Sequence, residues 1–300
     1  MGTMYHNPVL LQESVKGLVI KEDGVYVDVT FGGGGHSKEI LKHLGDKGKL
    51  FAFDQDEDAI GNVIDDKRFS LINENFRYIK QFLKFYGIRK VDGILADFGV
   101  SSHQFDKAER GFSTRFDADL DMRMSRRNAI SAYEVVNDYV YDDLRRVLFQ
   151  YGDLRNANAM AKTILEQREL APIRTTDRLK EVLRQFLPKG REHKILAQIY
   201  QAIRIEVNQE IQVIKEFLEQ TSDLLDEGGR LSIISYHSLE DRLVKRFIRA
   251  GQFEGEPEKD FYGNIDVPFK KVGPLIVPSR EEIKKNNRAR SAKLRIAARI

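Results

Sequence analysis

The four consecutive glycines at residues 32–35 are the first part of the chain whose type and spacing could do chemistry. They follow a short β-branched stretch at residues 25–29 and precede a helical pattern. Glycine lets a backbone approach a ligand closely and places the start of the next helix beside it. The nicotinamide fingerprint G-x-G-x-x-G is not met, because Ser37 stands at the third glycine position when the pattern starts at Gly32. The run predicts a ligand-binding loop, with a tight strand-to-helix turn as the alternative.

Two carboxylates follow predicted strands further along the chain. Asp54 comes directly after the stretch 49–53, and Asp97 follows the stretch 91–96. A carboxylate after the second strand is where α/β folds hydrogen-bond a ribose diol, and ligands bind at the carboxyl ends of parallel strands. With the glycine loop, these residues would form a crevice that suits an adenosine-containing cofactor. The alternative for each aspartate is a cap of the loop or helix that follows it.

Other catalytic signals are weaker or missing. His36 and His237 are candidate general bases, although a lone histidine is more often structural. The absence of cysteine excludes disulfides, thiolate metal sites and cysteine nucleophiles. The sequence holds no H-E-x-x-H, no tight His/Asp cluster, no G-x-S-x-G elbow and no P-loop. We therefore expect no metal site and no nucleotide hydrolase of the P-loop class.

The elements that must position these residues alternate between strand and helix over the first hundred residues. Short strands are predicted at 25–29, 49–53, 69–72 and 91–96, and later at 230–236 and 291–300. Such alternation predicts a doubly wound α/β fold with a parallel sheet, of the Rossmann-like type.

A helical insert interrupts this pattern. Residues 105–205 show no strong strand signal and several helical stretches, which predicts a discontinuous domain of residues 1–104 and 206–300 with an inserted helical domain. One long helix is expected where apolar residues from Ile195 to Leu218 recur on one face. Ser238 and Asp241 fit a capping box for a helix over 239–249, and residues 252–271 are expected to form a loop.

Charge is clustered although the net charge is only +3. Residues 280–300 hold eight basic and two acidic residues, and residues 145–204 hold 13 basic and six acidic ones. Such clusters indicate a polyanion such as nucleic acid, with a solvated helix surface as the alternative. The 41% of hydrophobic residues exclude wholesale disorder. No apolar run approaches the roughly 18 residues of a membrane span and no signal peptide is visible, so a cytoplasmic location without a membrane partner is expected.

Eight segments along the chain resemble the bacterial ribosomal RNA small subunit methyltransferase H (MraW) family. Its members methylate N4 of a cytidine in 16S rRNA with S-adenosylmethionine. The matching segments are HNPVLLQE (6–13), YVDVTFGGGGHS (26–37), DGILADFGVSS (92–102), AERGFS (108–113), LDMRM (120–124), QAIRIEVNQE (201–210), GGRLSIISYHSLEDRLVKRF (228–247) and NNRARSAKLR (286–295). The resemblance implies an S-adenosylmethionine-dependent methyltransferase fold that acts on 16S rRNA of the small ribosomal subunit.

The resemblance also implies a set of cofactor-binding residues. Asp54 would hold the ribose hydroxyls and Phe76 would lie near the adenine. The full implied set is Gly34, Gly35, His36, Asp54, Phe76, Asp97 and Gln104. The loop that begins at Asp97 is expected to present the group that accepts a hydrogen bond from the reacting N4. Whether the Asp97 carboxylate does so as a catalytic group, or only contacts the cofactor, is left open.

RNA contact is expected from the insert and from the C-terminal basic segment. The candidate residues are Arg110, Arg115, Arg123, Arg126, Arg127, Arg288 and Arg290. A dimerisation element or structural lid is the alternative for the insert, and a homodimer is an open alternative to a monomer. A methyltransferase with another acceptor and a non-catalytic ribosome assembly factor remain the competing functions.

Three departures from the family pattern stand out. Gly33 occupies a position where some members have arginine. The stretch K-H-P-A-T-R-x-F-Q-A reads HKILAQIYQA at residues 193–202 and lacks the proline and the threonine-arginine pair. The usual S-F-H-S carries Tyr236 in place of phenylalanine, a change expected to matter little.

Overall fold

The computed structural model describes residues 8–257, 261–262 and 265–300. The start of the resembling segment at residues 6–13 and part of the loop expected at 252–271 lie outside these residues. Seven described strands form one sheet in the order β3-β2-β1-β4-β5-β7-β6. They are β1 (Val25–Asp28), β2 (Lys49–Phe53), β3 (Phe69–Ile72), β4 (Val91–Asp97), β5 (Leu225–Ser235), β6 (Phe269–Ile276) and β7 (Lys293–Arg299).

The first five strands run parallel, and β7 pairs antiparallel with both β5 and β6. The chain therefore winds outward from β1 in both directions, which confirms the doubly wound, Rossmann-like α/β class. In such a sheet β1 and β4 lie next to each other although about 60 residues separate them in sequence. Their carboxyl ends, and that of β2, thus reach the same edge.

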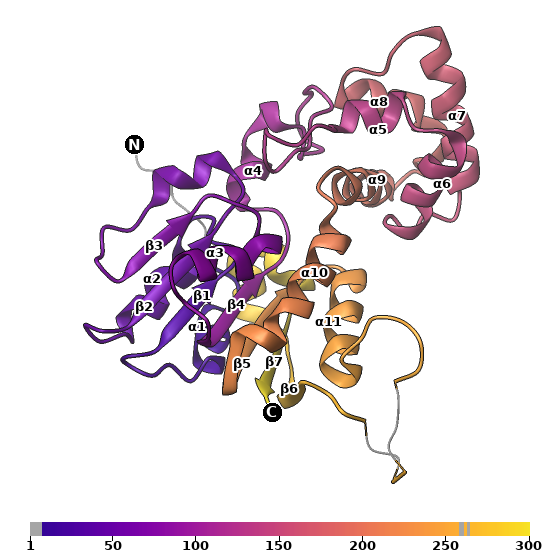
Figure 1. The fold of residues 1–300 in the computed structure, drawn as a ribbon. Coiled ribbons are helices and arrows are strands. Elements are labelled where there is room, and N and C mark those ends of the chain that lie inside the picture. The colour runs from indigo at the N-terminus through magenta and orange to yellow at the C-terminus, as the bar shows by residue number, and fades with distance from the viewer. Residues whose placement is uncertain (1–7, 258–260, 263–264) are drawn as a thin grey trace. The chain divides into compact units, whose positions relative to one another are not determined.

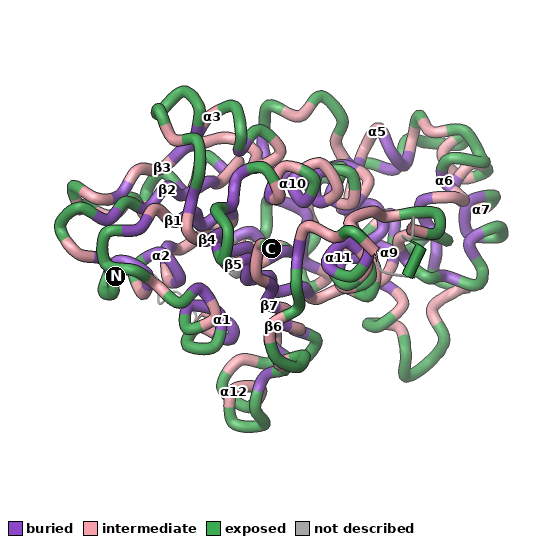
Figure 2. The backbone as a smooth tube through the Cα atoms, turned by 60° about the horizontal axis from the view of Figure 1, so that its bottom comes forward, coloured by how far each residue is buried: buried purple, intermediate pink, exposed green. Residues whose placement is uncertain are grey.

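Helices bury both faces of the sheet (Figure 1). One apolar cluster joins β1 and β2 to α1 and α2, and the other joins the central strands to α3, α10 and α11. Because both faces are covered, the central strands are nearly continuous apolar runs, and Figure 2 shows them as buried backbone. The helices are α1 (Leu11–Gly17), α2 (Gly35–Lys42), α3 (Ile79–Phe85), α10 (Glu210–Leu224), α11 (Ser238–Ala250) and α12 (Arg280–Lys285).

The chain divides into two compact units. Unit 1 takes the described residues up to Gly99 and from Ile211 onward, and unit 2 is Val100–Glu210. Unit 2 has its own apolar core and contains no strand of the sheet among its described residues. Its helices are α4 (Ser102–Asp106), α5 (Ala132–Asn137), α6 (Tyr141–Gln150), α7 (Ala157–Leu170), α8 (Thr176–Val182) and α9 (Glu192–Val207). In the described part of the chain no helix is long and apolar enough to cross a bilayer.

The single long helix expected from the apolar stripe is wrong. The helix α9 ends at Val207, Gln209 has a φ of 51°, and α10 begins at Glu210. Asn208 accounts for the break: its side chain donates to the carbonyls of Met122 and Arg204 and accepts from the Met124 N–H at 2.7 Å. The stripe continues across the break because its first half packs in the core of unit 2 and its second half in that of unit 1.

The predicted capping box of α11 is displaced by one residue. His237, rather than Ser238, is the N-cap, and its Nδ1 accepts from the Leu239 N–H. Glu240, rather than Asp241, returns the bond by accepting from the His237 N–H at 3.0 Å. Glu240 is almost fully buried, so this cap sits inside the fold rather than on its surface.

The residues after Asp54 predict a helix that extends to about residue 63, and the structure has a 3-10 helix there, over Glu57–Asn62. One further prediction needs correction. The loop expected to extend to residue 271 ends earlier, because β6 begins at Phe269. The strand β6 lies at the edge of the sheet, and its Phe269 is buried while Lys270 and Lys271 are exposed. With so few apolar residues, its composition resembles that of a loop, which is why the strand was not predicted.

Candidate cofactor site and the helical unit

The glycine loop joins the end of β1 to the first turn of α2. Gly34 has a φ of 75°, a backbone conformation that favours glycine. At Gly35 a Cβ atom would overlap the Cγ atom of Pro8, so no side chain fits there without movement of the chain. The glycines thus form a tight turn into α2, in which the Gly34 N–H donates to the Phe31 carbonyl at 2.8 Å. Ligand binding by this loop stays a prediction.

Asp54 lies at the end of β2 and closes this loop. Its Oδ2 accepts from the Gly32 N–H at 2.7 Å and its Oδ1 accepts from the Asp56 N–H at 2.8 Å. Burial raises the pKa of the Asp54 carboxyl to about 6. The carboxylate thus caps the loop, which was the alternative expectation, and each oxygen keeps a lone pair for a further donor such as a hydroxyl.

Asp97 lies at the end of β4 and is held on three sides. Its backbone N–H donates to Thr30 Oγ1 at 2.7 Å, its Oδ1 accepts from the Tyr236 hydroxyl at 2.9 Å, and its Oδ2 lies 3.9 Å from Nδ1 of His36. Burial raises the pKa of the Asp97 carboxyl to about 6. The side chain remains about one-fifth exposed, so a ligand can reach it.

His36 faces Asp97 from the first turn of α2. Its Nε2 lies 3.2 Å from the carbonyl oxygen of Val9, which can only accept, so Nε2 carries the proton. Burial lowers the pKa of His36, and the neutral ring then presents the lone pair of Nδ1 to the site. A histidine in this state can accept a hydrogen bond from a ligand.

Asp28, which the sequence analysis did not single out, ends β1 and is completely buried. It accepts from the Ser37 hydroxyl at 2.7 Å and from the Thr30 N–H at 3.1 Å, and so ties α2 to the sheet. Burial raises the pKa of the Asp28 carboxyl to about 6, and its charge also raises the pKa of Asp54 and Asp97. The sequence did contain a sign of this role, namely an acidic residue inside the β-branched stretch 25–29, but that stretch was interpreted only as a strand.

A cluster of aromatic rings lies beyond the end of β4. Phe76 and Phe98 are stacked, with ring centroids 6.0 Å apart and planes 26° apart, and Phe217 meets both edge-on. Phe76 is half-buried and packs against the core from one side. The residue implied only by resemblance thus lies in unit 1, as do the glycine loop, Asp54 and Asp97.

Gln104, the last residue of the implied cofactor set, lies in unit 2. Its side chain accepts from the Ser101 N–H at 3.1 Å and is buried. Its place in the cofactor pocket stays a prediction.

The candidate RNA-binding arginines divide by environment. Arg110 is buried and donates to the carbonyls of Arg123 and Met124, and Arg123 forms a two-bond ion pair with Asp121. Both guanidinium groups are thus engaged in holding the loop. The other three candidates in unit 2 are exposed: Arg115, Arg126 and Arg127. In unit 1, Arg288 is half-buried and Arg290 is exposed.

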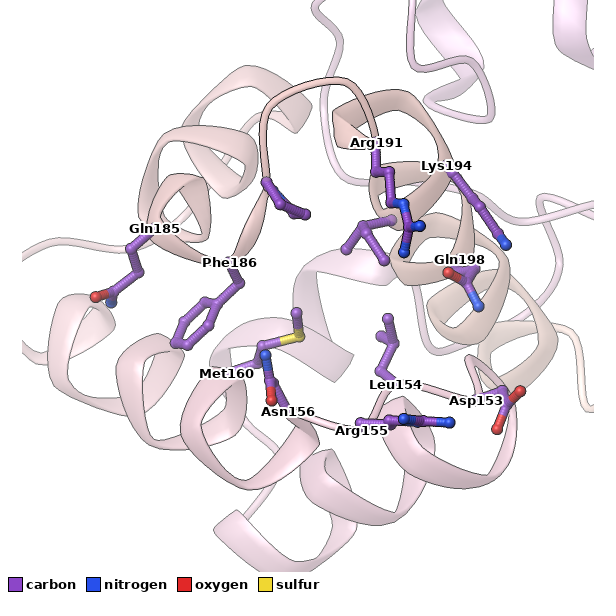
Figure 3. Close-up of a pocket in the computed structure, with 12 residues that line it drawn as sticks. Asp153, Leu154, Arg155, Asn156, Met160, Gln185, Phe186, Arg191, Lys194 and Gln198 are labelled. Carbon is purple, nitrogen blue, oxygen red and sulfur yellow. The ribbon is translucent and has the colours of Figure 1, made fainter.

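Unit 2 also contains a pocket of about 520 Å³ that the sequence analysis missed. Arg191 and Lys194 lie on the side formed by the start of α9, and Arg155 lies on the side before α7 (Figure 3). All three are exposed, and among the described residues none forms an ion pair. The rest of the lining is mixed and includes the apolar Met160 and Phe186 as well as the acidic Asp153. Nothing in residues 145–204 beyond a general positive charge pointed to this concavity.

A glycine loop after β1 and carboxylates after β2 and β4 all lie at the carboxyl edge of this parallel sheet. Doubly wound α/β proteins with these features bind adenosine-containing ligands at that edge. Residues 3–300 match the profile of the MraW methylase family. The chain belongs to that family, which confirms the resemblance, and it is a methyltransferase that uses S-adenosylmethionine.

Relatives match over almost the full chain. A protein of Flavobacterium johnsoniae named ribosomal RNA small subunit methyltransferase H is 71% identical, with 99% of this chain and 98% of the relative covered. A protein of the same name from Christiangramia forsetii is 69% identical, with 99% and 98% covered. Among solved structures, an rRNA methylase from Streptococcus thermophilus is 12% identical with a TM-score of 0.44, and the match covers 100% of this chain and 99% of that one.

Proposed function

We propose that this protein transfers the methyl group of S-adenosylmethionine to N4 of a cytidine in the 16S rRNA of the small ribosomal subunit. Membership of the MraW methylase family and two near-full-length relatives named for the small-subunit RNA support this substrate. The observation that carries the proposal in the structure is the accessible carboxylate of Asp97, held at the end of β4 beside the glycine loop.

The residues of unit 1 fit the cofactor. Asp54 would accept hydrogen bonds from the ribose hydroxyls, and the ring surface of Phe76 would lie against the adenine. The charges of Asp28 and Asp97 repel each other, which raises the pKa of Asp97. A positively charged sulfonium bound near them would be stabilised by both carboxylates. When bound, the cofactor supplies an electrophilic methyl group on a positively charged sulfur.

The protein mainly positions and desolvates in such an in-line displacement. The lone pair of cytosine N4 is delocalised into the ring, so N4 is a poor nucleophile. An acceptor on one N4 hydrogen localises that lone pair. As the N–C bond forms and the methyl–sulfur bond breaks, the proton on N4 would leave to a carboxylate or to water, since a backbone carbonyl can accept the hydrogen bond but not the proton. Asp97 or a carbonyl of the loop after it would act as this acceptor, and His36 would offer a second lone pair nearby.

The exposed cations of unit 2 would hold the RNA. Arg115, Arg126 and Arg127 lie on its surface, and the pocket adds Arg155, Arg191 and Lys194. Lys194 and Gln198 belong to the stretch 193–202, so an RNA contact made there would involve residues that depart from the family pattern. Exposed cations suit phosphate contact, which positions RNA without reading its sequence.

A methylation assay tests the proposal. Small subunits that lack the modification are incubated with the protein and with S-adenosylmethionine labelled in the methyl group, and the digested rRNA is analysed by mass spectrometry. Label on N4 of one cytidine is the expected result. Label on another base, on DNA or on protein would show that cytidine N4 is not the acceptor. Tight cofactor binding without any transfer would favour the alternative of a non-catalytic assembly factor.

The homodimer and the cytoplasmic location stay predictions. Sedimentation at micromolar concentration separates a monomer of 34.6 kDa from a dimer.

A further inference from the structure

Tyr236 follows β5 and is fixed at both its backbone and its ring. The Phe98 N–H donates to the Ile234 carbonyl at 2.9 Å, which aligns the ends of β4 and β5. The Tyr236 N–H donates to Oε2 of the buried Glu240 at 2.8 Å. The ring therefore starts from a rigid position next to the loop that begins at Asp97.

The side chain contacts that loop at two points. The hydroxyl donates to Asp97 Oδ1 at 2.9 Å. Two residues further on, the ring lies against the backbone of Gly99, where an added Cβ would be 3.4 Å from Cδ2 of Tyr236 and where φ is 120°. A larger residue at Gly99 would be strained by its backbone conformation. Tyr236 thus supports both the carboxylate and the turn that follows it.

We propose that Tyr236 is a positioning residue for Asp97: its hydroxyl fixes Oδ1, which leaves Oδ2 on the side that faces His36 and the first turn of α2. The part of this inference that concerns the reaction rests on the proposed function. Phenylalanine is usual at this position in the resembling family, and the sequence predicted little effect of the hydroxyl. The hydrogen bond to Asp97 gives the hydroxyl a partner that phenylalanine could not have.

The charged surroundings make this donor important. Asp97 faces the neutral His36 from α2, Asp28 from β1 and Glu240 from α11. The charges of Asp28 and Glu240 raise the pKa of Asp97. The nearby His36, when it carries a proton, lowers that pKa, and so does the hydrogen bond from the Tyr236 hydroxyl, which does not depend on the protonation of His36. Tyr236 itself faces Asp97, Glu240 and Glu282, and burial with these carboxylates raises its pKa well above the usual range. Tyr236 therefore remains a hydrogen-bond donor at neutral pH.

The variant Tyr236→Phe tests the inference without relying on catalysis. The titration of Asp97 is followed by NMR of protein labelled with ¹³C at the aspartate carboxyl carbons, and its signal is identified by its absence from Asp97→Asn. We expect the pKa of Asp97 to rise by about one unit in Tyr236→Phe, because a hydrogen bond to the charged form is lost. An unchanged titration of Asp97 would overturn the proposal.

The matched control is Tyr26→Phe. Tyr26 also lies in unit 1, and its hydroxyl accepts from the Lys21 N–H at 2.7 Å, far from the carboxyl ends of the strands. We expect the Asp97 titration of this variant to equal that of the wild type. A shift of the same size in Tyr26→Phe would show a general effect of a lost hydroxyl and would also overturn the proposal.

The pH profile of kcat/KM adds the link to the reaction. In Tyr236→Phe we expect its acidic limb to move up by about one unit, with the rate recovered above pH 8, whereas a misfolded variant would be slow at every pH. If Asp97→Asn keeps the wild-type rate, the role of Asp97 in the proposed function fails. If Asp97→Asn is slow while Tyr236→Phe keeps the wild-type profile, only the positioning role fails.

Discussion

At the scale of single residues, Asp28 stands out because a hydroxyl and an amide, rather than a cation, hold its buried carboxyl in the described structure. Its pKa is raised from 3.8 to about 6 by burial. The folded protein therefore binds a proton at this site between these two values, while the unfolded chain does not. The stabilising contribution is complete below the unfolded pKa and is lost as the pH rises through 6.

We predict that Asp28→Asn gains stability relative to the wild type as the pH rises. The amide keeps an acceptor for the Thr30 N–H but cannot ionise. From pH 4.5 to pH 7.5 the difference in free energy of unfolding should move in favour of the variant by about 2 kcal/mol, given a native pKa of about 6. Urea denaturation at the two pH values measures it.

The exposed Asp46, whose side chain is 90% accessible, provides the control substitution Asp46→Asn. Its difference from the wild type should be the same at both pH values. A pH-independent difference for Asp28→Asn as well would contradict the prediction, because Asp28 would then titrate alike in the folded and unfolded chains.

A second prediction concerns cofactor binding by Asp54. The variant Asp54→Asn should bind S-adenosylmethionine at least about tenfold more weakly, because hydrogen bonds to a charged acceptor are worth roughly 1.5–3 kcal/mol. Titration calorimetry at pH 8, where the wild-type carboxyl is ionised, measures the change. Asp46→Asn should bind like the wild type. A Kd within twofold of the wild type for Asp54→Asn would leave this carboxylate as a loop cap alone.

At the scale of elements, the junction between α9 and α10 is the clearest test. Asn208 satisfies the Met124 N–H and the Met122 carbonyl, two backbone groups that are buried with it. We predict that Asn208→Ala lowers the free energy of unfolding by about 2–4 kcal/mol, since these groups would lose their partners. Asn158→Ala, an exposed position on α7, is the control and should change stability by less than about 0.5 kcal/mol. Equal losses in both variants would refute the role of Asn208.

Elements with a strong local pattern could be predicted from the sequence. The strands at Lys49–Phe53 and Phe69–Ile72 have the expected bounds, because short apolar runs lie between clear turn signals. The end of the helix at Asn208 could not be predicted. The apolar stripe shows that one face is buried, but it does not show that the residues before Asn208 pack in one core and those after it in another. The cap at His237 was missed because histidine at an N-cap is uncommon, while the serine beside it fits the usual rule.

The site divides in the same way. The glycine loop, Asp54 and Asp97 could be found from residue type and their place at strand ends. Phe76 and Gln104 came from resemblance, since an aromatic residue or an amide beside a helix start is ordinary in any fold. The Tyr236 hydroxyl bond and the pocket of unit 2 depend on side chains that meet only in three dimensions, about 140 residues apart for Tyr236 and Asp97.

At the scale of the whole molecule, charge is distributed for contact with a polyanion although the net charge is small. We predict that binding of the substrate RNA weakens steeply with salt. Replacing Arg155, Arg191 and Lys194 together by alanine should reduce the slope of log K against log salt concentration by about two, since each phosphate contact contributes roughly 0.7–0.9. Fluorescence anisotropy with a labelled RNA fragment between 50 and about 300 mM salt measures it.

The control replaces three exposed lysines of unit 1, Lys47, Lys49 and Lys84, by alanine. This variant removes the same charge and should keep the wild-type slope. A slope reduced equally in both triple variants would mean that only net charge matters, and the pocket would have no part in RNA binding.

The strand order has a consequence for the synthesis of the protein. A ribosome delivers β1 to β4 first, then the whole of unit 2, and only afterwards β5 and β6, while β7 follows last and must insert between those two. The first four strands therefore wait with an open edge on β4 while more than a hundred residues emerge, and unit 2, with a core of its own, is ready to fold before the sheet around it is complete. The nascent chain thus passes through a stage in which unit 2 can be folded while the sheet still lacks β5, β6 and β7. At this stage the exposed edge of β4 is open to wrong pairing, so this is where a chaperone would be needed most.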